Sequence, residues 1–472
     1  MSKKAEELND KIKSLRMMPV EKRNEYVYRM PLISLSHELL VENLEFAVEK
    51  KIHDLIWGLQ KELIDQIKPA ANTEQGKSSY TNVLRSCFGE LREAVMLVEH
   101  KYGDDGMFTS LNQEKFTNAL REIPRDSALR QFAGTLFLHM GDILRYMNDE
   151  ELCQKYYTIA LLIQPEKGQT WNQLGVFYES NPKKTNSGSN EKLHAVNAYN
   201  LFTSLYYYYR AIFAPIPFTA EKNIKRILAK VFKEFTKNPP AKPDFEEIFL
   251  VLLAVIDSNT DITNEDALFK GFRSSIRDQI LDLEVKDFLQ ILLIILGTYE
   301  MMIKKPKNRR IIERLLTETY EVLVGLLLQN WDSVFINTYH LYVMSMLERV
   351  SINLENHPDV KASFACVSDI MELYLERELQ LDPLRNFSID CFGPLSDLVQ
   401  TDLSYASFLS YLKATIGPRK EPELPPILNT SDTTSVFDTD DLNVTLTSND
   451  AIEVMTNSSH VQWGYKSRRS SF

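Results

Sequence analysis

The 472-residue chain has few glycines and few cysteines. Its 16 glycines are too sparse for a phosphate-binding loop, and neither GxxxxGK[ST] nor GxGxxG occurs. The four cysteines, Cys87, Cys153, Cys366 and Cys391, lie far apart without a CxxC pair, which argues against a zinc site or a disulfide framework. A hydrophobic content of 44% with so little glycine favours long helices over β-structure.

Catalytic signatures are also missing. The eight histidines form no HExxH or HxH motif, and the paired acidic residues fall on polar faces of predicted helices. We therefore expect a protein that is not an enzyme and that has no metal or other cofactor.

Long hydrophobic runs are absent as well. Segments such as Ile248–Ile256 are too short to span a bilayer, and the polar N-terminal end does not resemble a signal peptide. The net charge of −11 argues against nonspecific nucleic-acid binding. We expect a cytoplasmic protein without membrane or direct nucleic-acid contacts, with shuttling to the nucleus left open.

Two stretches of the chain repeat each other at a spacing of 34 residues, which is the tetratricopeptide period. Small residues of this pattern let paired helices approach closely, and its proline ends the second helix. The first stretch carries Phe137, Met140, Gly141, Leu144, Cys153, Tyr157, Ala160 and Pro165, and the second restarts with Trp171, Leu174, Gly175 and Tyr178.

Hydrophobic periodicity and turn residues predict an all-α chain with four parts: an N-terminal extension (1–32), a repeat domain (33–219), stacked helical hairpins (220–416) and a tail (417–472). The tail has eight acidic residues and no Lys or Arg between Glu421 and Tyr465, which predicts disorder. The helices of the second part are predicted at 33–68, 80–102, 128–148, 150–163, 168–180 and 192–214, with a loop from Pro69 to Ser79.

Residues 36–225 resemble the Smg family of nonsense-mediated mRNA decay adaptors, whose pattern is a GDI-x-RY helix, a YY-x-x-A helix and an NQL helix. Here these elements are Gly141–Tyr146, Tyr156–Ala160 and Asn172–Leu174. The stretch Leu44–Lys51 with Trp57, and Tyr206–Arg210, are similar to the Smg-seven branch of that family. The resemblance implies a 14-3-3-like domain built on tetratricopeptide helices, followed by an α-helical hairpin domain.

The resemblance also implies a phosphopeptide site. A phosphoserine brings about two negative charges, so its receptor needs a forked donor with supporting donors. In the family pattern Arg145 and Tyr146 hold the phosphate, and Asn172 holds the backbone of the ligand. The family's third basic residue aligns with Glu62, one position after Lys61. We choose Lys61, which lies about 200° around the helix from Leu59, and keep Lys50 as the alternative.

The leading hypothesis is a non-catalytic decay adaptor that binds a phosphorylated segment of the up-frameshift RNA helicase and links it to RNA-degrading or phosphatase machinery. The resemblance further implies a heterodimer with a Smg-five-like partner through the N-terminal domain. Two alternatives stay open: a telomerase-associated relative of the same fold, and a generic tetratricopeptide scaffold or co-chaperone. A nuclease domain, present in another Smg branch, has no counterpart in the sequence.

Overall fold

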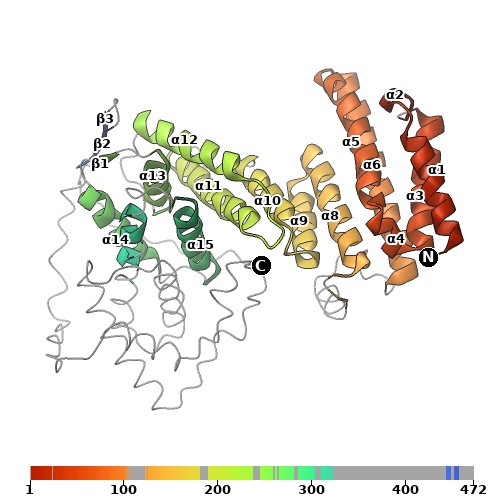
Figure 1. Ribbon diagram of the computed structural model, residues 1–472. Helices are drawn as coiled ribbons and strands as arrows, with labels where there is room; N and C mark the ends of the chain where they lie inside the picture. Colours follow the sequence, from red (N-terminus) through yellow and green to blue (C-terminus); the bar gives the residue numbers. More distant parts are fainter. Residues whose placement is uncertain are drawn as a thin grey trace, which may run out of the picture. The chain divides into compact units, whose positions relative to one another are not determined.

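The computed structural model forms two compact units, Met1–Asn181 with Arg210–Thr219, and Pro182–Tyr209 with Ala220–Phe472 (Figure 1). Ala220, where the predicted hairpin domain begins, is also where the second unit resumes. The structure describes residues 2–322, 443–447 and 451–455. The gaps within 2–322 are 24, 104–107, 109–122, 125, 181–189, 238–244, 259–260, 263–264, 281–284, 303–309, 316 and 320–321.

The first unit is a stack of helices, drawn from red to yellow in Figure 1. Its elements are α1 (Lys3–Arg16), α2 (Val20–Arg23), α3 (Tyr26–Glu42), α4 (Leu44–Glu49), α5 (Ile52–Ile67), the 3-10 helix η1 (Lys68–Asn72), α6 (Glu74–Tyr102), α8 (Ala128–Tyr146), α9 (Glu150–Ile163) and α10 (Gly168–Ser180). Short polar side chains start several of them by accepting a hydrogen bond from a backbone N–H of the first turn. These N-caps are Ser2, Asn43, Thr73, Ser127 and Asp149.

The single helix predicted over 33–68 is wrong, because the chain breaks twice in that span. Asn43 is extended (φ −157°) and caps α4, and Lys51 takes a left-handed conformation (φ 56°) before α5. The predicted loop from Pro69 to Ser79 is also wrong over most of its length, since η1 and the start of α6 occupy it. The helix predicted from residue 33 in fact begins earlier, because α3 starts at Tyr26 and includes Pro31.

Residues 1–32, set apart as an extension by the sequence, form α1, α2 and the start of α3. Helix α1 packs on α3 and buries Ala5, Leu8 and Ile12. This segment is therefore part of the first unit's core.

The repeat helices agree with the predicted ranges, and α8 packs closely on α9. Gly141 makes this approach possible, because a Cβ at this position would lie 2.6 Å from two ring carbons of Tyr157. Gly175 is buried in α10. The close contact predicted for Gly141 is confirmed.

A buried polar cluster joins three helices of the first unit. The Arg29 guanidinium on α3 donates to Glu90 on α6 (2.9 Å) and to Gln60 on α5, and Gln60 also donates to Glu90 (2.5 Å). Because Gln60 precedes Lys61, this cluster fixes the part of α5 that carries the predicted phosphate ligand.

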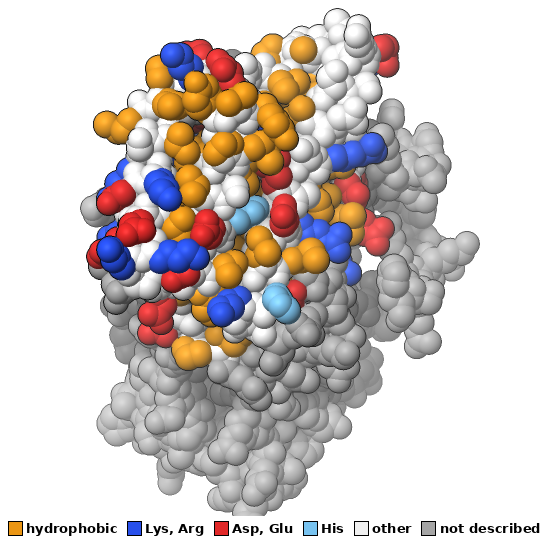
Figure 2. Space-filling model, turned by 90° about the vertical axis from the view of Figure 1, so that its right-hand side faces the viewer, with side chains coloured by type: hydrophobic (Ala, Val, Ile, Leu, Met, Phe, Trp, Pro, Cys, Tyr) orange, Lys and Arg blue, Asp and Glu red, His pale blue; other side chains and the backbone are white. Residues whose placement is uncertain are grey.

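The N-terminal helices form the face that Figure 2 shows, where basic and acidic side chains alternate and hydrophobic side chains gather toward the upper end. Three large hydrophobic residues near the α1–α3 connection are well exposed: Met17, Tyr26 and Val27.

The second unit contains most of α11 (Asn190–Ile212), then α12 (Glu221–Lys237), α13 (Phe245–Ser258), α14 (Glu265–Ile280) and α15 (Val285–Met302). Helix α13 is its centre, with both faces buried between α12 and α14. Tyr209 lies against Gly297 of α15, and its hydroxyl pairs with Thr298 (2.7 Å).

A small antiparallel sheet completes the second unit. Strand β1 (Asp261–Ile262) pairs with β2 (Asn443–Thr447), which pairs with β3 (Ala451–Met455). The hairpin of β2 and β3 falls in the predicted tail, and the rest of that tail lies outside the described residues. Apart from these strands, the regular elements that the structure describes are helices, so the predicted all-α fold is confirmed.

Candidate functional site

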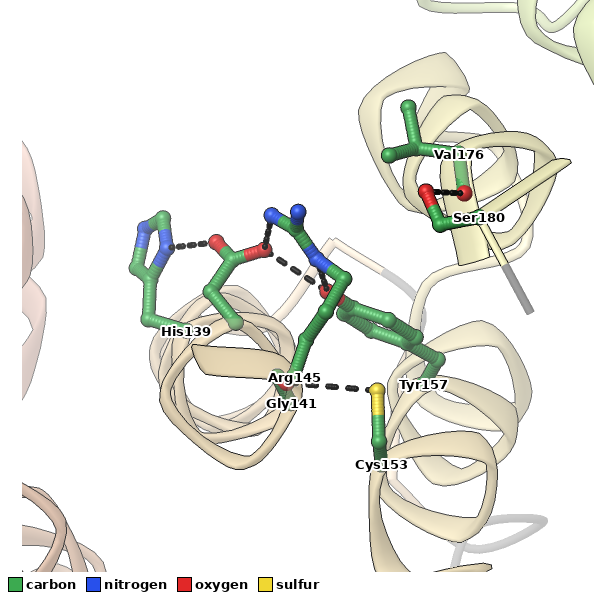
Figure 3. Close-up of polar contacts among 8 residues, drawn as sticks. His139, Gly141, Arg145, Cys153, Tyr157, Val176 and Ser180 are labelled. Atoms are coloured by element: carbon green, nitrogen blue, oxygen red, sulfur yellow. Dashed lines mark hydrogen bonds and ion pairs between the residues drawn. The ribbon is translucent and has the colours of Figure 1, made fainter. Parts of the chain in front are cut away.

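Arg145 lies in the last turn of α8 and is held by two neighbours (Figure 3). Its Nε donates to the hydroxyl of Tyr157 (3.2 Å), and Nη2 donates to Oδ1 of Asp142 (3.4 Å). The Tyr157 hydroxyl in turn donates to the same Asp142 oxygen (2.8 Å), and the other oxygen pairs with Nδ1 of His139 (3.3 Å). The Asp142 carboxylate is therefore fully engaged, and it fixes the direction of the guanidinium.

The Arg145 side chain stays accessible in this arrangement, with 23% of its surface exposed. The two hydrogen bonds above use Nε and Nη2, Tyr146 lies close enough to hydrogen-bond to the guanidinium, and Figure 3 shows both terminal nitrogens directed away from the Tyr157 ring. Burial disfavours the charged form, but Tyr157 and Asp142 outweigh that effect, so the pKa of Arg145 is raised. A permanently charged, preoriented and partly exposed guanidinium can bind an external oxyanion.

Tyr146, the next residue in the sequence, has the cationic groups of Arg145 and Lys68 near its ring. The Arg145 guanidinium lies 5.0 Å from the Tyr146 ring centre, and Lys68 Nζ lies 5.8 Å from the same centre. Burial raises the pKa of the Tyr146 hydroxyl, and Asp142 adds to the effect, so the phenol is a neutral donor at physiological pH. Lys68 was not predicted as a site residue, because it is the last residue of the helix expected over 33–68 and belongs to no family motif.

Lys61 is on α5 near this group. It forms an exposed ion pair with Asp65 (2.5 Å), and both residues are close enough to Tyr80 to affect its pKa, as is Tyr146. Exposed pairs of this kind contribute about 0–1 kcal/mol. An anion could therefore replace Asp65 as the partner of Lys61 at little cost.

The other two predicted residues lie in different surroundings. Lys50 pairs with Glu49 (2.6 Å) and lies over the Phe46 ring, so its contacts favour Lys61 as the residue beside Tyr146. Asn172 is buried on α10, next to Trp171, whose ring lies 4.1 Å from the Arg210 guanidinium. Its role in holding a ligand stays a prediction.

A second group of side chains continues along α5 and α8 away from Arg145. The rings of Trp57 and His139 stack with centres 4.2 Å apart. One turn before Trp57 lies His53, and one turn before His139 lies Thr135, whose hydroxyl accepts a hydrogen bond from Lys167 Nζ (3.2 Å). We call this area the α5–α8 surface; it comprises His53, Trp57, Lys61, Thr135, His139, Asp142, Arg145 and Tyr146. The sequence did not indicate Lys167, which follows α9 in a loop.

The described residues contain no group of three or more His, Cys, Asp or Glu side chains arranged to hold a metal ion. Within the same part of the chain, none of the helices has the length and hydrophobicity needed to cross a membrane.

Comparisons with known proteins find similarity to nonsense-mediated mRNA decay factors and to an Est1 domain. Residues 153–381 match the model of the Est1 DNA/RNA binding domain. Nonsense-mediated mRNA decay factor SMG7 of zebrafish (Danio rerio) is 24% identical over 242 residues. The chain also matches a structure of the C. elegans SMG5–SMG7 complex with a TM-score of 0.63 and 16% identity, over 88% of this chain and 100% of that chain. The chain is thus similar to SMG7 and to the Est1 DNA/RNA binding domain.

Zebrafish SMG5 is a further relative, 27% identical over 160 residues, or 31% of this chain and 13% of that protein. The match to zebrafish SMG7 covers 47% of this chain and 19% of the relative. The matched region thus spans about a fifth of the length of SMG7, and the structural match shows that the helical fold is shared.

Proposed function

We propose that this chain is a non-catalytic adaptor of nonsense-mediated mRNA decay that binds phosphoserine or phosphothreonine peptides. Its target is the phosphorylated up-frameshift RNA helicase, which it links to decay or dephosphorylation machinery in the cytoplasm. A Smg-five-like protein is the expected heterodimer partner. The two zebrafish relatives, both named as decay factors, support this role.

The observation that carries the proposal is the anchored but accessible Arg145. A buried carboxylate and a buried phenol hold one side of the guanidinium, and the Arg145 side chain stays 23% exposed. Tyr146, Lys61 and Lys68 add a hydroxyl and two cations nearby. This donor set fits a phosphate dianion, because it combines one fixed fork with mobile charges.

Asp142 is the principal objection, since a carboxylate beside Arg145 opposes an anionic ligand. It is 4% exposed, and both of its oxygens are occupied by Tyr157, His139 and Arg145. Its charge is therefore largely offset by these partners, and it acts to position Arg145.

The test is binding of a fluorescent helicase-derived peptide, phosphorylated or unphosphorylated, to the full chain. We expect binding of the phosphorylated form alone, weakening as salt rises. Arg145→Glu should abolish it, and Arg145→Lys should weaken it about tenfold or more, because lysine offers no fork. Arg85→Glu, an exposed position on α6, is the matched control. Normal phosphopeptide binding by Arg145→Glu would refute the proposal.

A second candidate function is supported by helix α12. The exposed face of this helix carries Lys222, Lys225, Arg226, Lys230 and Lys233, although the whole chain is acidic. The helix lies in the region that matches the Est1 DNA/RNA binding domain. A nucleic-acid contact along α12 would favour the telomerase-related alternative. Retention of single-stranded RNA or DNA by the wild type, lost in Lys225→Glu/Lys230→Glu, would support it.

A further inference from the structure

Lys167 is a half-buried ammonium group that no carboxylate of a described residue pairs with. Its Nζ donates to one neutral partner, the Thr135 hydroxyl, at 3.2 Å. Burial lowers the pKa of Lys167, and the more distant Asp54 and Glu166 only partly oppose this effect. A cation withdrawn from water without a counterion is costly, so its retention calls for an explanation.

The backbone around Lys167 is fixed rather than loosely exposed. Gly168 N–H donates to the Ile216 carbonyl (2.8 Å), and Ile216 N–H donates to the Glu166 carbonyl (2.9 Å). A Cβ on Gly168 would lie 2.3 Å from the Ala211 carbonyl oxygen, so this close approach requires glycine. The chain therefore holds the lysine at a defined place beside α8.

The groups beside Lys167 suit a polar ligand. Thr135 and His53 are each more than nine-tenths buried, and Nδ1 of His53 has no hydrogen-bond partner in the described structure. Burial lowers the pKa of His53, Asp54 opposes this with a carboxylate 3.6 Å from Nε2, and Lys167 and His139 add to the lowering. The Trp57–His139 stack lies between this group and Arg145 along α8 and α5.

We propose that Lys167 forms a second anion subsite on the α5–α8 surface, which binds an acidic side chain of the same peptide that Arg145 binds through its phosphate. The proposal rests on the proposed function. The ligand is thus a doubly anionic segment: one phosphoserine or phosphothreonine and one carboxylate or second phosphate.

The helix geometry sets the spacing between the two anions. Thr135, the partner of Lys167, precedes Arg145 by ten residues on α8, and at 1.5 Å per residue this is about 15 Å. An extended peptide advances about 3.3 Å per residue. The second acid is therefore expected about four residues from the phosphorylated one, with the Trp57–His139 stack facing the residues between.

The test uses the full chain and short peptides with one phosphoserine and otherwise neutral residues. A second acid, aspartate in one series and phosphoserine in another, is placed three, four or five residues before or after the first. We expect one spacing to increase affinity about tenfold. Lys167→Gln should remove this gain without changing the affinity for the singly phosphorylated peptide, whereas Lys155→Gln, exposed on α9, should retain it. The series with the larger gain identifies the natural acid.

A second measurement needs no variant and so is independent of whether Lys167→Gln folds. Acylation of lysine amines, followed by peptide mass spectrometry, should show Lys167 protected by the doubly anionic peptide and not by the singly phosphorylated one. An equal gain in Lys167→Gln, no gain at any spacing, or equal labelling of Lys167 would overturn the inference. If the singly phosphorylated peptide does not bind the wild type at all, the proposed function itself fails.

Discussion

At the scale of single residues, replacing Gly141 or Gly89 by alanine should change the free energy of unfolding in opposite directions. A Cβ on Gly141 would overlap the Tyr157 ring, whereas a Cβ on Gly89, inside α6, would meet nothing within 4 Å. Gly141→Ala should lower the free energy of unfolding by about 1–3 kcal/mol through overpacking, and Gly89→Ala should raise it by up to about 1 kcal/mol.

Urea or thermal denaturation of both variants measures these changes. Because Tyr157 also bonds to Arg145, Gly141→Ala should weaken phosphopeptide binding as well, while Gly89→Ala should leave it unchanged. Equal stability of the two variants would contradict the close approach of α8 to α9.

The residues of the site were only partly predictable from the sequence. The family motif points to Arg145 and Tyr146, and Lys61 was chosen over Lys50 because it lies one position before Glu62, with which the family's third basic residue aligns. Lys68 and Lys167 were missed because neither belongs to a family motif: Lys68 ends the helix predicted over 33–68, and Lys167 lies in a connection. The anchoring by Tyr157 was also missed, since it depends on how closely two helices approach.

At the scale of elements, α3 carries a buried histidine against α6. Burial lowers the pKa of His37, and Glu93 and Glu90 only partly offset this. The unfolded chain therefore takes up a proton near pH 6.5, while the folded chain stays neutral to a lower pH. The free energy of unfolding should fall as the pH drops through about 6.5, and His53, whose pKa is also lowered, acts in the same direction.

Urea denaturation at pH values from 8 down to 5.5 measures this dependence. His37→Gln should show a shallower decrease than the wild type, because one of the two groups that cause it is gone. A steeper decrease in His37→Gln would show that the histidine is protonated in the folded chain.

The helix ends predicted from the sequence were wrong at two breaks of the chain, Asn43 and Lys51. Asn43 is an ordinary N-cap with the acidic Glu45 in the first turn of the helix, and the break before α4 could have been read from these two residues. The left-handed Lys51 has no such signal, since lysine rarely takes that conformation. The repeat helices were predicted well because their 34-residue pattern fixes both helices and the turn between them.

At the scale of the whole molecule, the expected heterodimer calls for an exposed apolar surface. The sequence of residues 80–102 carries more apolar residues than one contact face needs, so we expect the Smg-five-like partner to meet whichever of Val95 and Met96 is exposed on α6. Val95 is buried, whereas Met96 is 48% exposed. Met96→Glu should abolish co-purification with the partner while leaving the unfolding temperature within a few degrees of the wild type.

The control for this variant is Arg85→Glu, which places a negative charge at another exposed position of the same helix. Arg85 precedes Met96 by about 16 Å along the helix axis, so this change should leave co-purification intact. If Met96→Glu still co-purifies with the partner, the interface lies elsewhere, and the exposed Met17, Tyr26 and Val27 become the next surface to test.

The interlocked contact of Gly141, Tyr157, Asp142 and Arg145 has an evolutionary consequence. The missing side chain of Gly141 lets the Tyr157 ring approach α8, and the hydroxyl of that ring holds Arg145 together with Asp142. None of the four can be exchanged without disturbing the others. Across an alignment of relatives these positions should therefore change together or not at all, and a lineage that has lost the arginine should be the one in which larger residues appear at the glycine.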